Sequence, residues 1–164
     1  MTEKSNSPYL KAERLKDVIA AIQVTGKYAF YKLSQTEWSK RIAGDESQAE
    51  YWCTVFSEHP EFFRFNETGD KVSLVWRRSY RKRYSVDDER NLSFTEYSNL
   101  SETEKMRVSR TPLTSDELSI LINTAISLHT RAIEQDREYR WLSSPLFSLL
   151  GVAFGSFLGW LIKG

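Results

Sequence analysis

The side chains best suited to catalysis or metal binding are few in this chain and widely spaced. Cysteine occurs once, at Cys53, and histidine twice, at His59 and His129. Zinc sites draw on clustered cysteine and histidine ligands, and a nucleophilic cysteine needs a neighbouring base, so the spacing favours neither. There is no glycine-rich phosphate-binding loop, and the carboxylate pair Asp87 and Asp88 falls in a predicted exposed turn. We therefore expect a protein that is not an enzyme and that needs no metal or cofactor.

A basic segment, WRRSYRKRYS, is the strongest candidate for contact with an anionic partner. Its cationic residues are Arg77, Arg78, Arg81, Lys82 and Arg83. They alternate with tyrosines, a pattern that suits a phosphate backbone. The net charge of the whole chain is only +1, so this local group would have to attract the partner by itself. Three interpretations stay open: side chains that are solvated or paired within the chain, a surface for lipid headgroups or a protein partner, and a nucleic-acid surface.

The segment from Trp141 to Ile162 contains no charged residue, although 27% of the chain is charged. As a helix, these 22 residues would extend about 33 Å, close to the thickness of the hydrocarbon core of a bilayer. The sequence therefore predicts a single transmembrane helix over 143–164 that acts as a tail anchor in membrane lipid. The alternative is a soluble protein in which this segment completes the core.

The residues flanking this segment indicate its orientation in the membrane. Tryptophan favours the headgroup level, and cationic residues are enriched on the cytoplasmic side of a span. More cations precede the segment than follow it, so the N-terminal part is expected in the cytoplasm. The residues predicted to lie at the membrane interface are Arg137, Arg140, Trp141, Trp160 and Lys163.

Glycine recurs at every fourth position inside the predicted span, at Gly151, Gly155 and Gly159. On a helix, residues four apart lie on one face, so these glycines would form a ridge without side chains. In lipid, such ridges let two helix backbones approach closely and associate. We therefore expect a homo-oligomer that assembles through the span.

The N-terminal half shows the periodicity of three helices followed by two strands. In order, the sequence predicts a flexible segment over 1–10, helices over 11–32, 34–44 and 45–59, and strands in FFRF and KVSLVW joined by a turn at NETGD. The order helix, helix, helix, hairpin resembles that of a winged helix-turn-helix domain, here spanning residues 11–86. The resemblance rests on element order alone. It implies a third helix that reads DNA, but that helix carries four acidic residues and no lysine or arginine, so nucleic-acid binding is disfavoured.

The second half is predicted to be a polar connector followed by one long helix. Ser93 with Glu96 and Ser101 with Glu104 have the spacing of helix capping boxes, which indicates short helices within the connector at 87–113. Thr114 opens an amphipathic helix over 114–142 that leads into the predicted span. The apolar stripe of this helix is expected to pack on the first domain or on the same helix of a neighbouring subunit. The fold class is therefore α+β and mostly α.

These features favour a non-enzymatic, membrane-anchored and self-associating binding or effector protein. Its cytoplasmic winged-helix-like domain would act as a sensor or adaptor for a protein partner or ligand that the sequence does not identify. This organisation resembles that of small single-span effectors and adaptors in bacterial stress and anti-phage systems. The alternative function is that of a membrane-tethered DNA-binding regulator.

Overall fold

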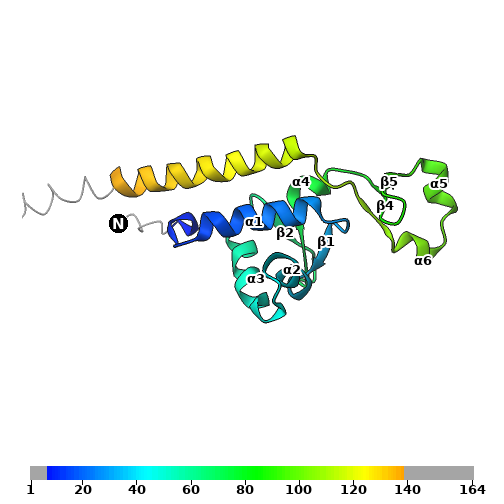
Figure 1. The fold of residues 1–164 in the computed structure, drawn as a ribbon, viewed down its shortest axis with the longest axis horizontal. Helices are drawn as coiled ribbons and strands as arrows, with labels where there is room; N and C mark the ends of the chain where they lie inside the picture. The colour runs from blue at the N-terminus through cyan, green and yellow to red at the C-terminus, as the bar shows by residue number, and fades with distance from the viewer. Residues whose placement is uncertain (1–6, 139–164) are drawn as a thin grey trace, which may run out of the picture.

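The computed structural model describes residues 7–138, which form an α+β fold made mostly of helices (Figure 1). No helix within this range is long and apolar enough to cross a membrane. The predicted span over 143–164 lies outside the described residues, together with its glycines and the interface residues Arg140, Trp141, Trp160 and Lys163.

The first structural unit contains helices α1, α2 and α3 and a three-stranded sheet. Its elements are η1 (Pro8–Leu10), α1 (Arg14–Lys27), β1 (Lys32–Ser34), α2 (Gln35–Ala43), η2 (Glu46–Gln48), α3 (Ala49–Glu58), β2 (Phe63–Phe65) and β3 (Lys71–Leu74). The prediction of a flexible segment over 1–10 is wrong at residues 8–10, because these residues form a 3₁₀ turn and bury Tyr9. The first helix is shorter than predicted, because the chain leaves helical geometry at Tyr28.

The sheet of this unit is antiparallel, with strand order β1-β3-β2. The β2–β3 turn closes at Gly69, whose φ of 74° suits glycine. The central strand β3 places Val72 and Leu74 in the core with Phe56 and Phe63. Trp38 of α2 fixes the helix to the sheet, since its indole Nε1 donates a hydrogen bond to the Val72 carbonyl at 2.9 Å.

Residues 82–110 form a separate part at one end of the molecule, which we call the lobe (Figure 1). It contains β4 (Lys82–Ser85), β5 (Arg90–Asn91), α5 (Phe94–Asn99), α6 (Glu102–Lys105) and β6 (Val108–Arg110), with strand order β5-β4-β6. The two predicted capping boxes, at Ser93 and Ser101, are confirmed. The structure adds strands β5 and β6 to the predicted connector. Because β4 pairs with these strands and not with β3, residues 82–85 belong to the lobe and not to the first domain.

The long helix, residues 115–138, runs antiparallel to α1 and extends past the N-terminal end of α1 (Figure 1). Thr114 caps its first turn, with the Thr114 hydroxyl accepting a hydrogen bond from the Glu117 N–H at 3.3 Å. Gly26 of α1 permits the close approach, because a Cβ at this position would lie 2.5 Å from a methyl carbon of Leu118. The apolar stripe of the long helix thus packs on the first domain, which was one of the two predicted arrangements.

Candidate functional site

The predicted strand through KVSLVW ends at Leu74, and the next four residues form a helical turn, α4 (Val75–Arg78). This turn directs Arg77 into the protein, where its exposed fraction is 0%. Its Nη1 donates to the carbonyls of Thr25 at 3.0 Å and Tyr28 at 2.5 Å, and its Nη2 donates to the carbonyl of Ala29 at 3.1 Å. Nη2 also donates to a carbonyl of β6, that of Arg110.

Arg77 therefore caps the C-terminal end of α1. The last carbonyls of any helix lack partners within the helix, and burying them without a donor is costly. A guanidinium can supply several donors at once, and a cation at this end also interacts favourably with the helix dipole. Burial lowers the pKa of Arg77 to about 10, so the group is still charged at neutral pH. The assignment of Arg77 to a nucleic-acid or anionic surface is therefore corrected: its guanidinium is in the interior.

The other four predicted cations remain partly or fully accessible. Arg78 makes only a long hydrogen bond, 3.5 Å, to the Phe65 carbonyl. The guanidinium carbon of Arg83 lies 5.2 Å from the ring centroid of Phe94. Arg81 and Lys82 are exposed, and their side chains form no hydrogen bond or ion pair with the part of the chain that the structure describes. The accessible basic group is thus smaller than the sequence indicated.

The basic group lies far from residue 138, the point at which the described chain ends. The Tyr80 hydroxyl donates a hydrogen bond to Glu117, which fixes this segment beside the first turn of the long helix. A helix over 115–138 extends about 35 Å. Arg137 is exposed at the far end. The basic group and residue 138 are therefore separated by about 35 Å along the helix.

The outward face of α3 is acidic or neutral, as the sequence indicated. Glu46 of η2 and Glu50 of α3 are exposed; Glu46 pairs with Lys40 at 2.6 Å, and Glu58 at the end of α3 pairs with Arg14 at 3.0 Å. The β2–β3 turn adds Glu67 and Asp70, both exposed. Phosphates would be repelled by the carboxylates of the helix, whereas the hairpin also exposes Arg64 and Lys71 and is close to neutral, so it offers no net attraction.

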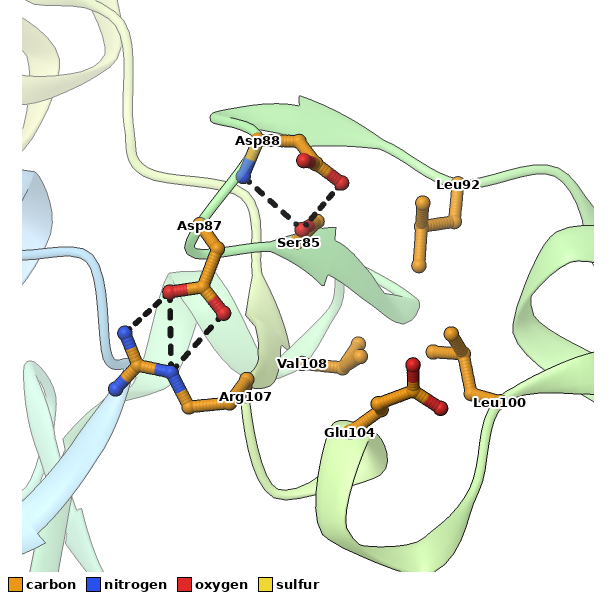
Figure 2. Close-up of a pocket in the computed structure, with 8 residues that line it drawn as sticks. All are labelled: Ser85, Asp87, Asp88, Leu92, Leu100, Glu104, Arg107 and Val108. Atoms are coloured by element: carbon orange, nitrogen blue, oxygen red, sulfur yellow. Dashed lines mark hydrogen bonds and ion pairs between the residues drawn. The ribbon is translucent and has the colours of Figure 1, made fainter.

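The lobe contains a pocket of about 250 Å³ between its sheet and α6 (Figure 2). Its apolar side is formed by Leu92, Leu100 and Val108, and its polar side by Ser85, Asp87, Asp88, Glu104 and Arg107. The volume is slightly below the usual range for ligand sites, so only a small molecule or a short side chain would fit.

The polar groups of this pocket are bonded to one another. Asp87 pairs with Arg107, whose Nη2 is 2.5 Å and whose Nε is 3.1 Å from carboxylate oxygens, and this ion pair lowers the pKa of Asp87 (Figure 2). The Ser85 hydroxyl donates to Asp88 at 3.0 Å. The carboxylate of Glu104 is bonded to Ser101, which lowers the pKa of Glu104. The pocket thus offers hydrogen-bond acceptors beside an apolar wall, a combination that suits binding more than catalysis.

The histidines and the cysteine do not form a common site. His59 is fully buried, with Nδ1 3.0 Å from a carboxylate oxygen of Glu61, and its ring makes an edge contact with Tyr9. Burial, and then the hydrogen bond to Glu61, raises the pKa of Tyr9. His129 and Cys53 are half-buried on separate helices. Within residues 7–138, no group of three or more histidine, cysteine or acidic residues could hold a metal ion.

Comparison of the chain with protein-family models, with curated proteins and with solved structures gave no match. Within the described residues, the features that bear on function are the acidic face of α3, the pocket in the lobe, and the long helix that carries the chain away from both.

Proposed function

We propose that this chain is a non-enzymatic, membrane-anchored binding protein, with residues 7–138 acting as a cytoplasmic sensor or adaptor and with copies that self-associate. The observation that carries the proposal is the course of the long helix. It leaves the lobe at residue 115 and brings the chain at residue 138 to within three residues of an uncharged segment, 141–162. Such a segment matches the length that a bilayer requires.

The first structural unit is compatible with a winged-helix-like domain. The order α1, α2, α3 and the β2–β3 hairpin is the order on which the resemblance was based. Fold alone does not decide function, and the acidic outward face of α3 opposes the DNA-reading role. The alternative, a membrane-tethered DNA-binding regulator, would have to rely on the accessible cations without the buried Arg77; these are Arg78, Arg81, Lys82 and Arg83.

We assign the binding of a partner or ligand to the lobe. The lobe contains the pocket, and it exposes Phe94 and Met106, which are 68% and 70% accessible. These two are the most exposed large apolar side chains in the part of the chain that the structure describes. The lobe also lies at the end of the molecule opposite residue 138 (Figure 1). A membrane beyond residue 138 would therefore leave the lobe accessible to a partner.

Membrane fractionation tests the anchoring. The chain should stay in the membrane pellet after washes with high salt and with alkaline carbonate. A double variant, Leu150→Asp with Leu158→Asp, should be released, because each carboxylate at the centre of a span costs about 3 kcal/mol. Release of the parent chain by high salt alone would contradict the proposal.

A further inference from the structure

The long helix has a second face that α1 does not cover. Leu118, Leu121 and Ala125 point into the core, whereas Ile120 and Ile126 are 53% and 41% exposed on the other side. Between Glu117 and Arg131 the helix carries no aspartate, glutamate, lysine or arginine. We call the exposed side chains in this stretch the outer face; they are Ser119, Ile120, Asn123, Thr124, Ile126, Ser127 and Thr130.

The hydroxyl groups of the outer face are already hydrogen-bonded within the helix. Ser119, Thr124, Ser127 and Thr130 each donate to the carbonyl four residues earlier, at 2.8 to 3.0 Å. A polar group that already has a partner loses little when water is removed from it. The hydroxyl groups of the outer face can therefore be buried against another surface at a small cost, whereas the amide of Asn123 needs a hydrogen-bond partner in that surface.

The chemistry of the outer face restricts its occupant. Nucleic acid and anionic lipid headgroups require cations, which this stretch lacks. A strongly charged protein partner would find no opposite charge here. A helix that stays in water typically exposes charged residues, as this one does at both ends, where Asp116, Arg131, Glu134 and Glu138 are exposed. Depletion of charge with exposed isoleucines is instead typical of the centre of a protein interface.

We propose that the outer face packs against the same face of a second copy of this chain, with the two helices parallel. An uncharged surface is not repelled by its own copy. The inference rests on the proposed function: copies anchored in one membrane after residue 138 would have their long helices directed away from it in the same sense. The second copy is then the surface present at the highest effective concentration.

The size of the face explains why membrane tethering matters. Residues 119–130 extend about 17 Å along the helix. One such helix pair buries less than the roughly 800 Å² per partner of a stable complex in solution. The contact is therefore expected to form in the membrane-bound protein, where diffusion in two dimensions replaces a free encounter.

Disulfide cross-linking of the full chain in membranes tests this contact, in a Cys53→Ser background that removes the native thiol. A two-fold parallel contact brings each position on the line of contact next to its own copy, within the 7 Å between Cα atoms that a disulfide needs, and Ser127 lies near the middle of the outer face. Ser127→Cys should therefore give a covalent dimer on oxidation. Thr68→Cys, an exposed position in the β2–β3 turn, is the matched control and should stay monomeric. Adding Ile120→Lys to Ser127→Cys should lower the dimer fraction about tenfold by placing like charges across the contact.

Equal dimer fractions from Ser127→Cys and Thr68→Cys, with both proteins retained in carbonate-washed membranes, would overturn this inference while leaving the membrane anchor intact. Loss of Ser127→Cys from the washed membranes, together with loss of the parent chain, would instead refute the proposed function and the inference with it. An unchanged dimer fraction after Ile120→Lys would also count against the outer face as the contact.

Discussion

Replacing Arg77 by methionine removes the cap of α1 while leaving a side chain of similar length to fill the space. The parent guanidinium donates to four carbonyls, three at the end of α1 and one in β6. In the Arg77→Met variant these carbonyls lose a donor that is itself fully buried. We expect the first domain and the lobe to separate more readily, because Arg77 joins both.

The size of the effect follows from two opposing contributions. A hydrogen bond from a charged donor contributes about 1.5–3 kcal/mol, so four such bonds would give at least about 6 kcal/mol. Burying the charged guanidinium costs several kcal/mol, and this cost offsets part of the hydrogen-bond contribution. The methionine side chain does not incur it. A net loss of about 3–4 kcal/mol is expected. This is a large part of the 5–15 kcal/mol that stabilises a typical domain.

Urea unfolding of the chain in mild detergent, followed by tryptophan fluorescence, measures this loss. Arg78→Met is the matched control, since it makes the same change at the adjacent exposed position and should alter the free energy of unfolding by less than about 0.5 kcal/mol. Arg77→Lys should recover only part of the stability, because one ammonium group cannot reach four divergent carbonyls. A loss below about 1 kcal/mol for Arg77→Met would refute the capping role.

Three further predictions concern the span, the basic group and the lobe. Gly155→Ile should remain in the membrane but lose its oligomer in mild detergent, because the side chain blocks close helix approach. Val152→Ile should leave the oligomer unchanged, and equal cross-linking of the two variants would argue against the glycine ridge. The double variant Arg81→Gln and Lys82→Gln should bind duplex DNA as weakly as the parent in gel-shift assays, whereas loss of a tight parent complex would support the DNA-binding alternative. Finally, the ion pair keeps the pKa of Asp87 below its unfolded value. Its stabilisation is therefore present above the unfolded pKa and lost as pH falls through the folded pKa. The protection factors of the lobe amides, which correct for the slower intrinsic exchange at low pH, should therefore fall on acidification.

Local capping chemistry could be predicted from the sequence. Ser34 with Glu37 has a capping-box spacing, and the structure contains that reciprocal pair and the helix it opens. The same holds at Ser93, Ser101 and Thr114. These signals succeed because all the atoms involved lie within one helical turn.

The position of Arg77 and the pocket could not be predicted in this way. Arg77 lies in a run of cations, and nothing in the neighbouring sequence distinguishes it from Arg78. Its burial depends on α4 ending the strand at Leu74 and on carbonyls about 50 residues earlier. The pocket likewise needs Asp87 and Arg107, which are 20 residues apart and meet only when β4 pairs with β6. Pairing of short strands depends on tertiary contacts more than on local propensity.

The number of residues in the long helix sets the rotation of the folded body about the helix axis, as well as the distance of the lobe from residue 138. Ala132 is its last buried residue among those described, so the body of the protein fixes the helix rotationally up to that point. Each residue inserted after Ala132 would turn the folded body by about 100° relative to whatever follows residue 138. Seven inserted residues would restore the original orientation to within about 20°, and one would not. The direction in which the lobe faces is thereby set by the number of residues in the helix.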